Sequence, residues 1–199
     1  MKKLILYSFI LVMSNCNKYD DTAPASHLQV PPFTEIGANT FGCLINGQVW
    51  ANFGETYVKP AEDILGLGGK WEPNLVRASI SFDNTAKDST LFLAGTYTLA
   101  KNGNVIKESW LNLWVPKGGA FVGIHQLTSG SGMVNYTISV PSASYRNIAR
   151  NPFTVTIKKD SVTAGLTHII SGTFSGMVYN YNQTDSLNIV GGVFDTSFQ

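Results

Sequence analysis

The chain has 199 residues, 14% of them charged, and a formal charge of +1; it is long enough for one domain with a substantial core and too apolar for a disordered protein. This near-neutral charge gives no electrostatic basis for binding nucleic acid, so no nucleic-acid partner is expected. Nineteen glycines and an aromatic content of 12% are typical of β-rich proteins outside the cytoplasm.

Residues 1–15 have the pattern of a signal peptide. Lys2 and Lys3 precede a mainly apolar run, Leu4 to Met13, which is too short to cross a bilayer and typical of a secretion signal. Removal of residues 1–15 lowers the formal charge from +1 to −1. The alternative is an ordinary secreted protein with an incidental cysteine after the apolar run.

That run ends in Met-Ser-Asn-Cys, which resembles a bacterial lipobox. The resemblance implies that Cys16 is acylated and becomes the mature N-terminus, although Asn15 departs from the usual Gly or Ala. More than one acyl chain would anchor the protein stably, where one chain is marginal. The following residues 17–21 resemble an acidic export tag, with an ordinary polar linker as the alternative.

Residues 16–39 are therefore predicted to be a lipidated N-terminus and an extended linker. Three prolines and a glycine interrupt the part from Thr22 to Asn39, which shows little periodicity. Such a segment favours an extended spacer that holds the domain away from the membrane. The folded domain is expected to span residues 40–199.

The domain opens with a predicted hairpin. Asn46-Gly47 lies between two apolar runs, and both residues tolerate the positive φ of a two-residue turn. If Cys16 is acylated, Cys43 is a lone thiol, and its place in an apolar run favours a small buried side chain over a reactive one. The flanking strands are predicted over residues 41–45 and 48–53.

Alternation of apolar and polar residues continues through the chain and predicts further strands. Residues 54–73 are expected to be a loop with one short strand near 64–67, and residues 141–152 a twelve-residue loop. Strands are predicted over residues 76–82, 91–99, 105–115, 121–127, 134–140 and 153–159.

The last stretch, Thr167 to Phe198, predicts a closing β-hairpin. Its apolar parity slips at Gly191-Gly192, and a bulge there would keep both halves of the last strand on the core. No segment shows a helical period over three turns. About nine or ten short strands predict an all-β fold, a single antiparallel β-sandwich with a β-barrel as the alternative.

Four segments resemble uncharacterised Bacteroidota lipoproteins whose domain has no known function, and the likeness extends over residues 1–199. It implies a lipid-anchored β-domain at the outer membrane, on the cell surface or the periplasmic face. It implies no activity and no catalytic residues. The segments that carry it are Phe41–Trp50, Gly95–Leu99, Ile170–Phe174 and Gly191–Asp195.

No catalytic residue, metal site or cofactor is predicted. His27, His125 and His168 are isolated and lack metal-ligand spacing. Adjacent carboxylates occur only as Asp20-Asp21 and Glu62-Asp63, and neighbours on a strand point to opposite faces. No nucleophile elbow, phosphate-binding loop or dinucleotide fingerprint is present.

The strand predicted over residues 105–115 carries the sharpest candidate site. Two tryptophans share the parity opposite to its leucines and would stand about 13 Å apart on one face. A flat aromatic pair with an amide between them suits stacking on sugar rings, and the alternative is packing in the core or under a loop. The candidate ligand-binding residues are Trp110, Asn112 and Trp114.

Four triplets that begin with Asp resemble the short O-glycosylation signal of Bacteroidota envelope proteins. Several lie in predicted turns or in the linker, where modification would be accessible. The candidate acceptors are Thr22, Ser89, Ser161 and Ser186.

These features favour a lipid-anchored envelope protein that acts as a binding module for a glycan or for another envelope protein. A hydrolase whose carboxylates converge in the fold is one alternative, and a structural envelope component is another. The expected partners are the membrane, through the acyl chains, and that glycan or protein. The sequence does not determine an oligomeric state.

Overall fold

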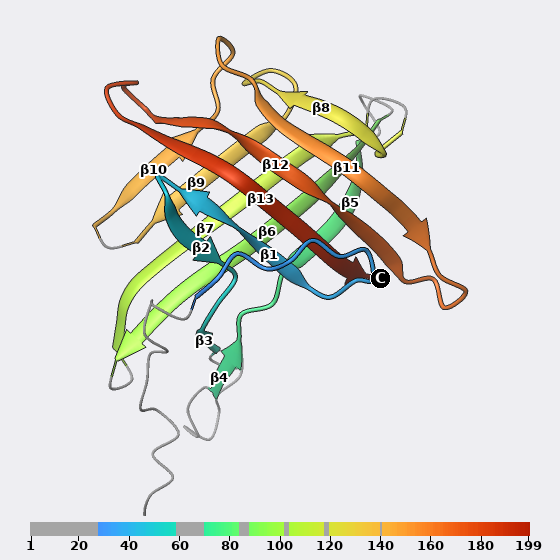
Figure 1. Cartoon of the computed structure of the whole chain (residues 1–199), viewed down its shortest axis with the longest axis horizontal. Helices are drawn as coiled ribbons and strands as arrows, with labels where there is room; N and C mark the ends of the chain where they lie inside the picture. Colours follow the sequence, from blue (N-terminus) through green and yellow to red (C-terminus); the bar gives the residue numbers. More distant parts are fainter. Residues whose placement is uncertain (1–27, 59–69, 84–87, 102–103, 118–119, 140) are drawn as a thin grey trace, which may run out of the picture.

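The computed structural model describes residues 28–58, 70–83, 88–101, 104–117, 120–139 and 141–199, which form an all-β structure (Figure 1). The described residues contain no helix, and hence no helix able to cross a membrane. Their strands are β1 (Thr40–Ile45), β2 (Gln48–Ala51), β3 (Glu55–Val58), β4 (Lys70–Pro73), β5 (Arg77–Asp83), β6 (Asp88–Lys101), β7 (Asn104–Pro116), β8 (Gly123–Leu127), β9 (Met133–Ile138), β10 (Ala143–Arg146), β11 (Phe153–Val162), β12 (His168–Asn180) and β13 (Ser186–Phe198).

Eleven of these strands form one antiparallel sheet in the order β2-β1-β13-β12-β10-β9-β7-β6-β5, and β11 and β8 extend it from β12. The sheet is strongly curled into a half-barrel, so that β12 and β13 cross over β6 and β7 (Figure 1). A parallel bridge between Phe53, just after β2, and Tyr97 of β6 links two distant parts of the sheet. The predicted all-β, antiparallel character is confirmed.

The core lies inside this curl, between the two facing halves of the sheet. Strand alternation directs apolar side chains inward from both halves, and aromatic rings fill the middle. Phe41 of β1 packs against Trp50 of β2 and Phe174 of β12, with ring centroids 5.8 and 5.1 Å apart. The largest fully buried side chains include Phe41, Phe153, Phe194, Leu91, Leu93, Leu111, Leu113 and Leu127.

The opening hairpin forms as predicted. β1 and β2 pair with Ile45 opposite Gln48, which leaves Asn46 and Gly47 as the two turn residues. Both have positive φ, 49° and 79°, as a two-residue turn that follows the strand twist requires. Cys43 of β1 is fully buried and unpaired, in line with its predicted role as a small core side chain.

The closing hairpin of β12 and β13 also forms, with the predicted bulge. The register with β12 shifts between the pairs Phe174–Gly192 and Gly176–Ile189, so β13 carries one extra residue there. Ile189 and Phe194 are five positions apart, which in a regular strand would put them on opposite faces, yet both are fully buried. The bulge is what returns the second half of β13 to the core.

Two predicted loops proved wrong in part. Within 54–73, the described residues form the small two-stranded sheet β3–β4, whereas the short strand expected near 64–67 lies outside the described residues. Within 141–152, residues Ala143–Arg146 form β10, which pairs with β9 and with β12. This segment is too short to show an alternation of its own. It becomes a strand because its backbone pairs with β9 on one side and with β12 on the other.

The residues just before β1 contact the domain at several points. Leu28 packs against the core, and the Lys158 ammonium lies 4.5 Å from the centroid of the Phe33 ring. The Lys159 ammonium donates a hydrogen bond to the backbone carbonyl of Glu35 (2.5 Å). Lysine side chains of β11 therefore reach the end of the expected linker.

Candidate functional site

β7 carries the predicted binding residues on its outer face. Leu111, Leu113 and Val115 point into the core and are fully buried. Because successive side chains alternate between faces, the intervening residues point away from the core, and each is only half-buried. These residues are Trp110, Asn112 and Trp114, and we call the surface around them the Trp110–Trp114 face.

Neighbouring strands extend this face on both sides. On β6 the paired residues are Thr96, Ala94 and Phe92, and the Phe92 ring lies 5.0 Å from that of Trp114 at 48°. The Phe92 contact supports Trp114 from one side. On β9 the residues paired with Trp110, Asn112 and Trp114 are Thr137, Asn135 and Met133.

The polar side chains of the face differ in whether they already form hydrogen bonds within the protein. The hydroxyls of Thr137 and Ser144 both donate to the side-chain oxygen of Asn135, at 3.3 and 3.1 Å. By contrast, within the described part of the chain the Asn112 amide and the two indole N–H groups form no hydrogen bond, and none of these atoms is buried. The face therefore presents two aromatic rings whose N–H groups, like the amide between them, remain able to hydrogen-bond a ligand.

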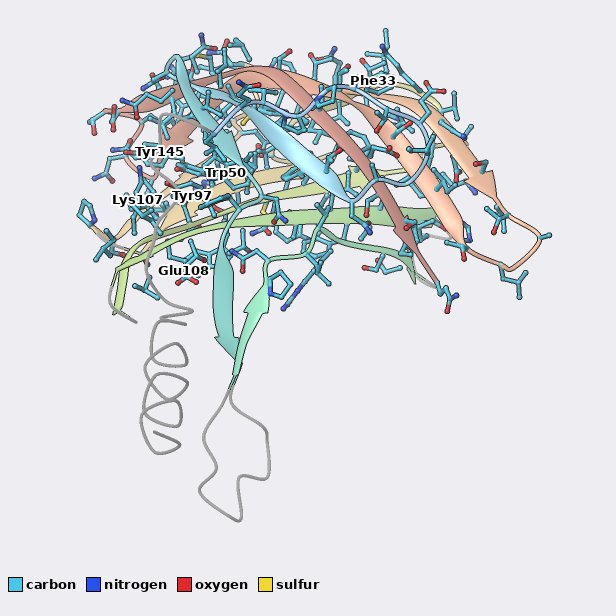
Figure 2. The ribbon with its side chains drawn as sticks, turned by 60° about the horizontal axis from the view of Figure 1, so that its bottom comes forward. Phe33, Trp50, Tyr97, Lys107, Glu108 and Tyr145 are labelled. Atoms are coloured by element: carbon cyan, nitrogen blue, oxygen red, sulfur yellow. The ribbon has the colours of Figure 1, made fainter. Side chains whose placement is uncertain are left out.

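A second site, which we call the end pocket, lies at one end of the curl and has a volume of about 260 Å³. Its floor is formed by Trp50 and Tyr136, its walls include apolar side chains of β1, β9 and β13, and Lys107 of β7 lies at its rim. Figure 2 shows Trp50, Tyr97 and Lys107 at the same end of the sheet. The apolar wall residues are Ile45, Ile138 and Leu187.

The floor of the end pocket is held by hydrogen bonds inside the core. The Trp50 indole donates to the hydroxyl of Ser109, which is fully buried (2.9 Å). Burial raises the pKa of Tyr136, although an interaction with the Ser109 hydroxyl opposes this effect. Tyr136 thus stays a neutral phenol at physiological pH, and the floor is uncharged.

Sequence reasoning missed the end pocket, but one signal for it was present. Lys107 shares the parity of Ser109 and Leu111, so the strand pattern directs a lysine toward the interior. In the structure Lys107 is nevertheless exposed, because it lies close to the open end of the sheet, at the rim of the pocket. Its aromatic and apolar partners come from other strands, and their proximity could not be read from spacing.

The described residues offer no clear catalytic or metal-binding arrangement. They contain no group of three or more His, Cys, Asp or Glu side chains that could hold a metal ion. His125 Nε2 lies 2.6 Å from the Phe121 carbonyl, and the His168 ring stacks on Phe198. None of the described residues that line the end pocket carries a carboxylate.

The remaining predicted sites fall in different places. Cys16 and Thr22 lie outside the described residues. Ser89, Ser161 and Ser186 are half-buried and lie at the ends of β6, β11 and β13, rather than in turns.

Comparisons with models of known protein families, with curated protein sequences and with solved structures find no match to this chain.

Proposed function

We propose that this protein is a binding module of the cell envelope that is anchored through lipid on Cys16 and binds carbohydrate on the Trp110–Trp114 face. The observation that carries the proposal is the row of two half-buried tryptophans, with an amide between them that forms no hydrogen bond to any described residue. In this proposal the two facing halves of the curled sheet act as the two layers of the predicted sandwich. The site is then the outer surface of one layer.

The chemistry of the face fits a sugar better than an apolar protein surface. Aromatic rings offer large flat areas for the apolar face of a pyranose, while amides and hydroxyls bond its hydroxyl groups. The Asn112 amide and the indole N–H groups supply donors, and Asn135 and Thr137 on the next strand extend the polar side. In the part of the chain that the structure describes, neither the face nor the end pocket holds an acidic pair, which favours binding over hydrolysis.

Tryptophan fluorescence of the full chain carrying Cys16→Ser, titrated with a panel of soluble glycans, tests this proposal. A glycan that binds should change the emission, and the Trp110→Ala/Trp114→Ala double variant should weaken binding about tenfold or more. Asn112→Ala should weaken binding without removing a ring. Ile124→Ala is the matched control, because this side chain is apolar, 71% exposed and on β8.

An absence of binding across the panel would contradict the proposal. A response that persists in the folded double variant would also contradict it, because the glycan would then bind elsewhere. The near-ultraviolet circular dichroism of each variant checks that it remains folded.

Replacement of Cys16 also tests the anchor itself. In the native host, Cys16→Ser should move the protein out of the membrane fraction, because acyl chains on that sulfur provide the attachment. Unchanged partitioning into detergent would overturn the lipid-anchor part of the proposal and leave the glycan part standing.

A further inference from the structure

We infer that the end pocket is a second binding site, which takes a small amphiphilic anion: a carboxylate or phosphate on a short apolar chain or ring. It is separate from the Trp110–Trp114 face, because the pocket opens at the end of the curl and the face lies on the outer side of β7. Both sites use β7, but they use opposite faces of that strand.

The position of Lys107 is the first argument. It shares the parity of the core-facing residues of β7 but is exposed at the rim of the pocket. Within the described residues it has no salt bridge, and its ammonium lies 5.8 Å from the centroid of the Tyr97 ring. A cation–π contact supports an ammonium without neutralising it. The positive charge thus stays available to a ligand at the rim.

The lining of the pocket is the second argument. Ile45, Ile138 and Leu187 form an apolar wall, and Trp50 with Tyr136 forms an aromatic floor that is more than nine-tenths buried. Polar and apolar groups contribute about equally to the open surface of this pocket, which suits a ligand with one apolar and one polar part. Here the apolar wall fits a hydrocarbon body, and the single cation fits an anionic group at the opening.

Charge complementarity decides the class of ligand. Among the described residues, those that line the pocket include one cation and no carboxylate, and the other polar side chains at the rim, Asn46 and Gln48, are uncharged. A cationic ligand would be repelled by Lys107, and a neutral ligand would leave its charge unused. An anion gains a charge-assisted hydrogen bond, which is stronger than a neutral one.

The experiment uses the full chain carrying Cys16→Ser, with its methyl groups labelled for NMR. Octanoate, octyl phosphate and octanol serve as probes, because they share the chain and differ in the head group. Octanoate or octyl phosphate should shift the methyl signals of Ile45, Ile138 and Leu187, and bind at least about tenfold more tightly than octanol. The methyl signals of Ile124, on the far strand β8, should not move.

Two lysine variants complete the test. Lys107→Gln should weaken binding of the anionic probes about tenfold and leave octanol unaffected. Lys158→Gln, at an exposed lysine on β11, should change nothing. The proposal is overturned if neither anionic probe shifts the pocket methyls, if octanol binds as tightly as they do, or if Lys107→Gln binds them like the parent protein.

Discussion

Asp195, near the end of β13, accepts a hydrogen bond from the hydroxyl of Thr34, 161 residues earlier in the chain. Its carboxylate also accepts hydrogen bonds from the backbone amides of Ile36, Gly37 and Ala38, at 3.1, 2.8 and 3.1 Å. This carboxylate is almost fully buried. One side chain therefore fastens the segment before β1 to the last strand.

We predict that Asp195→Asn destabilises the protein by about 2–3 kcal/mol, because the amide cannot accept all four hydrogen bonds and places its own N–H groups against donors. Urea unfolding at neutral pH measures the effect. Asp185→Asn is the matched control, since Asp185 is exposed and accepts from the Tyr145 hydroxyl at 2.8 Å. Equal losses in the two variants would contradict the special role of Asp195.

The same carboxylate predicts a dependence of stability on pH. Burial alone would raise the pKa of Asp195, but the hydrogen bonds from Thr34, Ala38, Gly37 and Ile36 outweigh it and hold the pKa below the ordinary value of 3.8. A lowered pKa gives stability that is complete above the unfolded value and is lost as pH falls through the folded value. The difference in unfolding free energy between the parent protein and Asp195→Asn should thus shrink below about pH 4. A constant difference would refute this linkage.

The stability of the protein should also be sensitive to the absence of a side chain at Gly172. A Cβ at this position would lie 2.2 Å from the backbone oxygen of Thr156 on β11 and 2.6 Å from the Phe194 ring. Because a backbone atom in a paired strand cannot move aside, Gly172→Ala should destabilise the protein by about 1–3 kcal/mol. Gly165→Ala is the control, since only the Thr163 hydroxyl lies near, at 3.9 Å. A thermal melt that is the same for both variants would show that the strands can separate at little cost.

Cys43 should be chemically inert in the folded protein. Burial raises the pKa of its thiol from 9.0 to about 12, so the reactive thiolate is scarce at neutral pH, and the side chain is inaccessible. In the chain carrying Cys16→Ser, a thiol reagent should detect no cysteine under native conditions and one in concentrated urea. Rapid labelling of the folded protein would place Cys43 at an opening in the core.

We also predict O-glycosylation of the mature protein at one or more of Thr22, Ser89, Ser161 and Ser186. Intact mass of protein from its native host should exceed that of the acylated chain by the mass of a glycan. Ser186→Ala tests the site next to the exposed turn before β13. A mass explained by acyl chains alone would end this prediction.

The sequence by itself determined those features that depend on local pattern. Alternation with a period of two assigned Leu111 to the core and Trp110 to the outer face, because neighbours on a strand must point in opposite directions. The parity slip at Gly191 predicted the bulge of β13, and Asn46-Gly47 predicted the first turn.

Only the tertiary structure decided which of these faces meet. The wall, floor and rim of the end pocket come from β1, β2 and β13, which are adjacent in the sheet, and from β7 and β9, which are adjacent elsewhere in it. These two groups of strands meet only when the sheet curls. The strand β10 and the hydrogen bond from Thr34 to Asp195 likewise depend on partners far away in the chain. Periodicity in the sequence shows which face of a strand is apolar. It does not show which distant strand pairs with it or which side chains it contacts, because these depend on how the whole sheet packs.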